Sequence, residues 1–278
     1  MIYFIVTVLG YFAAAGSLYW LLYLRRLSPF ASQPALSLSK LSFSKTWAAI
    51  RSDVVLSVLS SGIFALCASF MTTAYSLGYT RLYLQPEQYG WWYLGASLGL
   101  VLVLQDTYFY FAHRFSHHPR CFKWLHQGHH HSKRPTPWTA FAFDPAEAII
   151  QAIYLAGVIV IIPMHLSVLV AVVIIMTLGA LLHHFGLRLF KASAVGSWLG
   201  SWIIGPTHHG LHHRKYTVHY SLYFTFWDKL LGTQHDGYEN VFNPSVSVFT
   251  AQKAAKKQPA TESLPNKTIP FQPLKKAS

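Results

Sequence analysis

Five apolar stretches, each close to the length needed to cross a lipid bilayer, constrain the fold of this chain more than any other feature. They lie near residues 2–24, 53–78, 91–112, 147–163 and 166–183. About 20 consecutive apolar residues in a helix cross a bilayer core. Hydrophobic residues make up 53% of the chain, charged residues only 11%, and the mean hydropathy is +0.31, which is too apolar for an ordinary soluble domain. The sequence therefore predicts an all-α integral membrane bundle.

The distribution of positive charge predicts which side of the membrane each end of the spans faces. The first stretch lacks a basic start and a clear cleavage site, so we expect it to stay in the protein as a span. Arg25 and Arg26 follow it, which places that end in the cytoplasm by the positive-inside rule. Alternating the remaining spans then leaves only Arg81 of the 22 Lys and Arg residues outside. All the histidine clusters are thereby predicted to form a cap on the cytoplasmic face.

The net charge of +13 and the pI near 9.7 fit this membrane orientation better than binding to nucleic acid. In a membrane protein such charge gathers at the cytoplasmic side and attracts anionic headgroups, so we expect no nucleic-acid partner. Cys67 and Cys121 lie in or beside apolar segments, and we expect neither a disulfide framework nor a thiolate metal site.

The chain is predicted to divide into three parts, without an internal repeat. Residues 1–50 hold the first span and, from about residue 27, a basic linker at the membrane interface. Residues 51–240 hold the other spans and all the histidines. Within this part, 147–183 is predicted to be a hairpin that turns at Pro163, and 185–205 an interfacial amphipathic segment. Residues 241–278 are polar and basic, and we expect this tail to be disordered.

A polar stripe on the third span introduces the histidines, all sixteen of which lie between His113 and His235. In this stripe Asp106, Tyr110, His113 and His117 are spaced by four, three and four residues. At about 100° per residue these side chains share one face of a helix. Imidazole is the commonest metal-ligating side chain, so the stripe predicts a metal site where the span reaches the cytoplasm.

Two copies of the spacing His-x-x-His-His follow the stripe. Because residues three and four positions apart share a helix face, we expect the three rings of each box to converge on one point. Other histidines fall on different faces or in loops, and we expect them to stand apart from the metal. The boxes are His126, His129, His130 and His209, His212, His213, and the histidines set aside are His118, His131, His165, His183, His208 and His235.

The composition of these clusters narrows the metal chemistry. Neither box contains a glutamate, so the His-Glu-x-x-His arrangement of metallopeptidases is absent. Eight or more convergent imidazoles exceed the needs of one tetrahedral zinc, so two metal ions are the simpler account. Haem would need histidines deep in facing spans, whereas these lie at span ends. A metal transporter would carry ligands inside its spans, where Asp106 is the main candidate.

These motifs resemble those of the sterol desaturase and fatty-acid hydroxylase superfamily, a group of membrane non-haem di-iron oxygenases. The resemblance covers roughly residues 50–235. The polar stripe is similar to the family's Asp, Tyr and His-x3-His pattern, the boxes to its His-x-x-His-His motifs, and residues 227–233 to its closing Trp-Asp-Arg-Leu-x-Gly-Thr. A further family histidine matches His184. The resemblance thus implies nine metal ligands: His113, His117, His126, His129, His130, His184, His209, His212 and His213.

Two departures from the family pattern concern residues beside the boxes. The chain has Asp144 and Glu147 in a segment where the family often has His-Pro-x-Glu, and His219 where it has the Asn of Asn-Tyr-Gly. His219 is therefore left open between a ligand and a supporting residue. Hydrogen-bonding partners fix the orientation of metal-ligating histidines. The candidates for that role are Asp106, Tyr110, Asp144, Glu147, His219 and Asp228.

The resemblance implies that 51–240 is a fatty-acid hydroxylase-like catalytic domain. Two iron ions would reduce dioxygen with electrons from a separate ferredoxin-like or cytochrome-type donor, and hydrogen abstraction from a C–H bond would lead to hydroxylation or desaturation. Zinc from an expression host can replace iron in purified protein. The expected substrate is a lipid, sterol-like or fatty-acyl, that enters from the bilayer. Residues 78–83 and 134–137 are similar to sterol C5-desaturases.

Two other functions remain open from the sequence. The first is a carotenoid-ring hydroxylase, which has similar histidine boxes and the same chemistry. The second is a non-catalytic membrane metal-binding protein or a metal transporter. Iron stoichiometry and oxygen consumption separate the second from an oxygenase.

Overall fold

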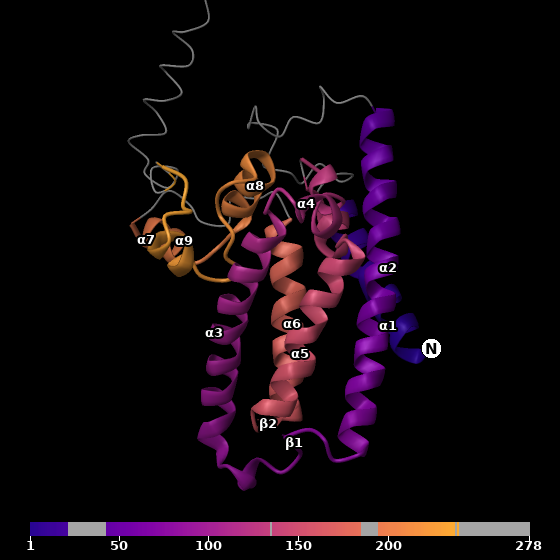
Figure 1. The fold of residues 1–278 in the computed structure, drawn as a ribbon, viewed down its shortest axis with the longest axis vertical. Helices are drawn as coiled ribbons and strands as arrows, with labels where there is room; N and C mark the ends of the chain where they lie inside the picture. The colour runs from indigo at the N-terminus through magenta and orange to yellow at the C-terminus, as the bar shows by residue number, and fades with distance from the viewer. Residues whose placement is uncertain (22–42, 134, 185–193, 237, 239–278) are drawn as a thin grey trace, which may run out of the picture.

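Long helices stand side by side, and short helices form a cap over one end of them (Figure 1). The computed structural model describes residues 1–21, 43–133, 135–184, 194–236 and 238. The long helices are α1 (Ile2–Tyr19), α2 (Phe43–Ser76), α3 (Trp91–Ser116), α5 (Pro145–Ile161) and α6 (Leu166–His183). The cap contains α4 (Phe122–Leu125), α7 (Ala194–Trp202), α8 (Pro206–Lys215) and α9 (Phe226–Leu230), with 3₁₀ turns η5 (His129–His131) and η6 (Pro137–Phe141).

The predicted all-α membrane bundle is confirmed, with one change in the number of full-length spans. Among the described residues, four helices are long and apolar enough to cross a membrane: Ile2–Tyr19, Trp47–Ser76, Trp91–Ser116 and Leu166–His183. The fourth expected span corresponds to α5, which has 17 residues and a length of about 25 Å at 1.5 Å per residue. This is shorter than the roughly 30 Å of a bilayer core. The structure thus has four full-length candidates and one shorter apolar helix where the sequence predicted five spans.

The far end of the bundle, opposite the cap, is closed by a short parallel bridge. Strand β1 (Leu82–Tyr83) pairs with β2 (Met164–His165), and the 3₁₀ turn η4 (Pro86–Gln88) follows β1 (Figure 1). The predicted turn at 163–165 therefore joins α5 to α6 at this end. Nε2 of His165 donates to the carbonyl of Leu84 at 2.9 Å, and Nδ1 accepts from the amide of Ser167 at 3.1 Å. This histidine therefore stabilises the turn, and it lies apart from the other histidines, as expected.

Apolar packing holds the inner helices together. The buried cluster draws on α3, α5, β2 and α6, and its members have at most 6% of their surface exposed. Lipid tails are as apolar as these side chains, so the hydrophobic effect does not drive the helices together. Close van der Waals packing holds them instead. The cluster consists of Val101, Val158, Ile159, Met164, Val168 and Val172.

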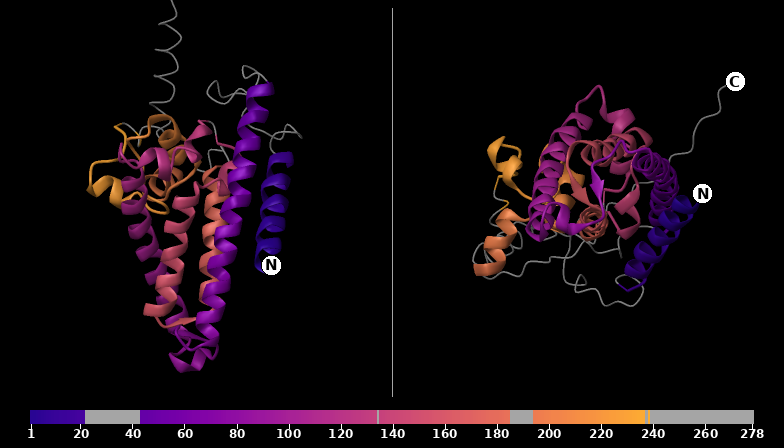
Figure 2. Two further views of the ribbon diagram at one scale, coloured as in Figure 1. Left: turned by 45° about the vertical axis from the view of Figure 1, so that its right-hand side comes forward. Right: turned by 90° about the horizontal axis from the view of Figure 1, so that it is seen from below.

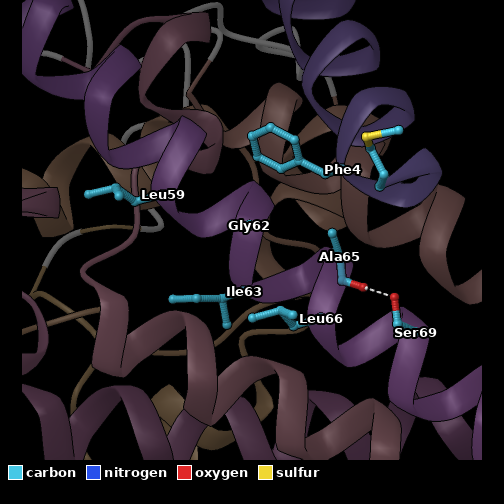
Figure 3. Close-up of a pocket in the computed structure, with 8 residues that line it drawn as sticks. Phe4, Leu59, Gly62, Ile63, Ala65, Leu66 and Ser69 are labelled. Carbon is cyan, nitrogen blue, oxygen red and sulfur yellow. Dashed lines mark hydrogen bonds between the residues drawn. The ribbon is translucent and has the colours of Figure 1, made fainter.

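Helix α1 lies against the outer side of α2 (Figure 2). Tyr11 donates to the backbone carbonyl of Trp138 at 2.9 Å, and the buried Ala15 lets the helix approach closely. An apolar groove between α1 and α2 is lined by Phe4, Leu59 and Leu66 (Figure 3). The described residues that line it have no acidic, basic or histidine side chain, so this groove has the character of a lipid-facing surface.

Helix α2 begins at Phe43, inside the segment expected to be linker, and its cap end anchors the loop before α5. The buried Asp53 accepts hydrogen bonds from Ser132 at 2.8 Å and Thr139 at 2.7 Å. Ser60 donates to the carbonyl of Phe143 at 3.0 Å. The rest of the predicted linker, residues 185–193 of the amphipathic segment and the predicted tail lie outside the described residues.

Candidate metal centre

Nine histidine side chains gather at the cap end in two groups. Within each group every residue offers one ring nitrogen, and these nitrogens lie within 4.8 Å of one another. The nine are the residues proposed as ligands from the sequence. The first group is His113, His117, His126, His130 and His212, and the second is His129, His184, His209 and His213.

Four segments of the chain, spread over residues 113–213, supply these rings. His113 lies in the last turn of α3 and His117 directly follows that helix. His184 directly follows α6. The first box occupies the segment from the end of α4 to η5, and the second lies on α8. The ends of two candidate membrane spans thus meet two short cap segments.

Each His-x-x-His-His box divides between the two groups, so the expectation that its three rings converge on one point is wrong. On α8 the rings of His209 and His213, four residues apart, join the second group, whereas His212 joins the first. Successive helical residues point about 100° apart, which turns His212 away from His213. In the first box α4 ends at Leu125 and η5 begins at His129, so no continuous helix carries the three rings.

Backbone carbonyls determine the protonation of several of these rings. In four of them Nδ1 lies 2.7–3.1 Å from a carbonyl oxygen. A carbonyl can only accept, so Nδ1 carries the proton and Nε2 presents a lone pair. The four pairs are His113 with Tyr220, His129 with Ala142, His184 with Ala180 and His212 with Val218.

The Nε2 atoms then face one another at short distances. His113 Nε2 lies 3.0 Å from His126 Nε2, and Nδ1 of His126 is bonded to the Glu147 carboxylate at 2.7 Å. Two lone pairs at this distance in a buried site repel each other, and a cation between them removes the repulsion. Ligands on adjacent positions of a metal with bonds of about 2.1 Å are about 3 Å apart. The donor set therefore fits a bound metal ion.

Burial also keeps the grouped imidazoles neutral. Loss of hydration lowers the pKa of His129 to about 4. The same cause, with repulsion from neighbouring imidazoles, lowers the pKa values of His212 and His213 well below the ordinary value. A ligating histidine must be unprotonated at the metal-binding nitrogen. The site therefore needs no deprotonation of these rings at neutral pH to take up a cation.

The two groups form one continuous site. The rings of His130 and His213, which belong to different groups, have centroids 4.6 Å apart. His129 and His130 are neighbours in sequence with ring centroids 5.8 Å apart, yet they serve different groups. This arrangement suits two metal ions side by side better than two independent sites.

Glu147 and Asp144 support the first box in different ways. Glu147, 3% exposed, contacts the ring of His126 directly. Asp144 contacts the backbone, because its Oδ2 accepts from the amides of Gly128 at 2.7 Å and His129 at 3.4 Å. A Cβ at position 128 would collide with the Asp144 carboxylate, so this approach requires glycine.

Asp106, Tyr110 and Asp228 hold the segment after α8 onto α3. Asp106 accepts from the amides of residues 222, 223 and 224 at 3.2, 2.7 and 3.2 Å. Asp228 accepts from the amides of Tyr220 at 2.8 Å and residue 221 at 3.1 Å. Thr233 bonds to Asp228 at 2.7 Å and to Tyr110 at 2.9 Å. These bonds fix the Tyr220 carbonyl that orients His113.

His219 lies outside both groups, in a buried cluster with His208 and Asp228. The rings of His208 and His219 have centroids 3.9 Å apart, and His208 Nε2 lies 3.2 Å from Asp228 Oδ2. His208, which was set aside from the sequence, lies in this cluster and outside both larger groups. Nε2 of His219 accepts the amide hydrogen of His235 at 3.2 Å, so Nδ1 carries the proton. In this protonation state His219 binds the backbone at His235, and it belongs to neither of the two larger histidine groups.

The other histidines set aside from the sequence also lie outside the two groups. His118 and His131 are exposed, and His165 is at the far end. The ring of His183 is 5.8 Å from that of His209 but belongs to neither group. No role for Asp53 was predicted from the sequence. A carboxylate at the start of an otherwise apolar stretch was the available signal for its anchoring contacts.

Comparison with known proteins relates the chain to lipid-modifying enzymes. Residues 98–233 match the family model described as fatty acid hydroxylase. The chain is 32% identical over 180 residues to the Delta(7)-sterol 5(6)-desaturase ERG3B of Gibberella zeae, covering 63% of this chain and 54% of that protein. It is also 32% identical over 158 residues to the lathosterol oxidase of Homo sapiens, covering 56% of this chain and 51% of that protein.

A third relative, the Delta(7)-sterol 5(6)-desaturase erg3C of Aspergillus fumigatus, is 32% identical over 192 residues, which cover 64% of this chain and 60% of that protein. The matched part of the chain thus spans about half to three fifths of the length of these relatives. No solved structure matches the chain.

Proposed function

Because the chain belongs to the sterol desaturase and fatty-acid hydroxylase superfamily, we propose that it is a membrane oxidoreductase that hydroxylates or desaturates a lipid. The reaction would use dioxygen and electrons from a separate donor protein. The observation that carries this proposal is the pair of histidine groups, whose neutral rings direct lone pairs at one another beside an apolar cavity.

The nine histidines would hold two iron ions. When bound, these ions would supply the reduction of dioxygen and the abstraction of hydrogen from an unactivated C–H bond. The chain's own residues orient the ligands: the Tyr220 carbonyl holds the ring of His113, and Glu147 holds that of His126. Partners of this kind fix the tautomer and raise ligand basicity. The burial of the rings keeps bulk water away from the reacting atoms.

An apolar cavity beside the histidines supports a lipid substrate. It has a volume of about 610 Å³ and lies among α2, α5 and α6. One wall includes Phe143, whose ring stacks on His129 with centroids 5.8 Å apart. Another includes Ala180, whose carbonyl accepts from His184. A hydrophobic molecule in this space would place a carbon next to the second histidine group. The relatives' names favour a sterol, and a fatty-acyl chain would also fit an apolar cavity.

The histidine end is proposed to face the cytoplasm. The cap lies at the same end of the bundle as the C-terminus of α1, which precedes Arg25 and Arg26 (Figure 1). Exposed Arg114, Arg120 and Lys123 lie at this end beside the first box. A ferredoxin-like or cytochrome-type donor with acidic residues could approach this basic surface.

A reconstitution experiment tests the function. Purified protein loaded with iron is given an electron donor, dioxygen and either a Δ7-sterol or a fatty-acyl lipid, and the lipids are analysed by mass spectrometry. We expect a product that has gained one oxygen atom or lost two hydrogens, with matching oxygen consumption. The zinc-loaded protein is the control. A folded preparation with two irons per chain that is inert toward every lipid tested would contradict the proposal and favour a non-catalytic metal-binding role.

A further inference from the structure

One polar side chain in the apolar cavity is not explained by the metal site. Gln151 lies on α5, has 8% of its surface exposed and lines the cavity. Among the described residues its amide has no hydrogen-bond partner. Burying an amide without a partner in apolar surroundings costs free energy, and this cost is removed when a ligand supplies the missing hydrogen bond.

Several other polar groups on the cavity wall make hydrogen bonds within the protein. Thr72 donates to the carbonyl of Ala68 at 2.8 Å, and the thiol of Cys67 lies 3.5 Å from the carbonyl of Ala152. The hydroxyls of Thr177 on α6 and of Tyr75, near the far end of α2, have no partner among the described residues. Of these three groups, Gln151 and Thr177 face the cavity from two different helices, and Tyr75 lies near the opposite end.

Both polar groups lie toward the histidine end. Gln151 is one helical turn, about 6 Å, from Glu147, which contacts His126. Thr177 is one turn before Ala180, whose carbonyl orients His184. From Thr177 to Leu166 at the start of α6 the axial length is about 16 Å. The lining residues on this part of α6 are apolar, which leaves room for a hydrocarbon body extending away from the metal site.

We propose that Gln151 is a specificity-determining residue that hydrogen-bonds a hydroxyl or carbonyl oxygen of the lipid substrate, with Thr177 assisting. This inference rests on the proposed function and adds a selection rule to it. The amide holds the polar group of the lipid at the histidine end, and the apolar body occupies the remainder of the cavity. The substrates selected are lipids in which the attacked C–H lies within a few bonds of the oxygen.

Equilibrium binding to purified, metal-loaded protein tests the proposal without turnover. The probes are two pairs that differ by one oxygen: lathosterol against its 3-deoxy counterpart, and 1-hexadecanol against hexadecane. We expect the wild-type protein to bind the alcohol of at least one pair about ten-fold more tightly, the effect of one well-made hydrogen bond in a dry site. The pair that shows the preference identifies the lipid class.

Gln151→Leu should bind the alcohol as weakly as the hydrocarbon while leaving hydrocarbon affinity unchanged. Gln151→Glu, which retains an acceptor, should keep the preference. Thr72→Val is the matched control, because its hydroxyl is already bonded to the backbone. If Gln151→Leu is misfolded, the ratio of alcohol to hydrocarbon affinity in the wild type and in Gln151→Glu still tests the proposal.

Equal binding within both wild-type pairs, failure to bind either alcohol, or an unchanged ratio in folded Gln151→Leu would overturn the assignment of Gln151. Tight binding with the expected ratio but no oxidation by iron-loaded protein would instead leave Gln151 as a binding residue and contradict the proposed oxygenase function.

Discussion

The cap end and the far half of the same helices are held together by different forces. At the cap end, buried carboxylates and imidazoles form hydrogen bonds with irregular backbone. Asp106, for example, accepts hydrogen bonds from three successive backbone amides. In the far half, α3, α5 and α6 meet through aliphatic side chains such as Val101, Val158 and Val172. Directional bonds fix positions to fractions of an ångström, whereas apolar packing tolerates small changes. The difference indicates that the cap end is built for chemistry and the far half for assembly.

The largest effect should come from removing a ligand at the cap end. His212→Ala removes from the first group a ring whose Nε2 lies 3.0 Å from Nε2 of His130. We expect loss of turnover and of bound metal. His129→Ala should act likewise on the second group. His131→Ala and His118→Ala, both exposed, should retain most activity. Metal analysis and oxygen consumption measure the effects. Equal losses in all four variants would show that the assignment of the rings is wrong.

A smaller effect is expected from Glu147→Gln. The amide oxygen can keep contact with Nδ1 of His126, but it is a weaker hydrogen-bond acceptor than a carboxylate oxygen. We expect metal affinity to fall about 10- to 100-fold, the usual cost of altering a residue that orients a metal-ligating histidine. Metal titration of the folded apoprotein measures this change. Glu87→Gln at the exposed far end is the control, and a similar loss there would remove the distinction between the two ends.

Gly128→Ala tests whether the cap tolerates one added methyl group. The new Cβ would collide with the Asp144 carboxylate that holds this backbone, so the first box must shift. We expect a loss of about 1–3 kcal/mol in stability, typical of overpacking, with weaker metal binding. Gly99→Ala on α3 has nothing within 4 Å of the new atom and should melt like the wild type. Thermal unfolding in detergent compares them, and identical curves would argue against a rigid cap.

The smallest effect on function should come from the far half. Val172 is fully buried in the apolar cluster, and Val172→Ala should lower stability by about 1–2 kcal/mol through lost packing. Metal content and the turnover rate below the melting temperature should stay unchanged. Val103→Ala, at a position 56% exposed, provides the matched change without a cavity. A loss of metal in Val172→Ala alone would show that the two regions are coupled.

The helices and the nine grouped histidines were predictable because both produce a recognisable pattern along the sequence. Long apolar runs predicted the spans within a few residues, although α2 extends to Phe43 and α5 is shorter than expected. Repeated spacings singled out the rings. The division of each box was not predictable, because it depends on where α4 ends and η5 begins. Asp53 was missed since its partners Ser132 and Thr139 lie about 80 residues away.

The sequence by itself determined an apolar helical bundle and a set of clustered imidazoles, because composition and spacing are local properties of the chain. Only the tertiary structure decided which ring faces which. The proton on Nδ1 of His113 is fixed by the carbonyl of Tyr220, 107 residues away, and that carbonyl is held in turn by Asp106 and Asp228. Every residue has the same backbone carbonyl, so no side-chain pattern in the sequence predicts which carbonyl will contact a given histidine. Their positions exist only after the chain has folded.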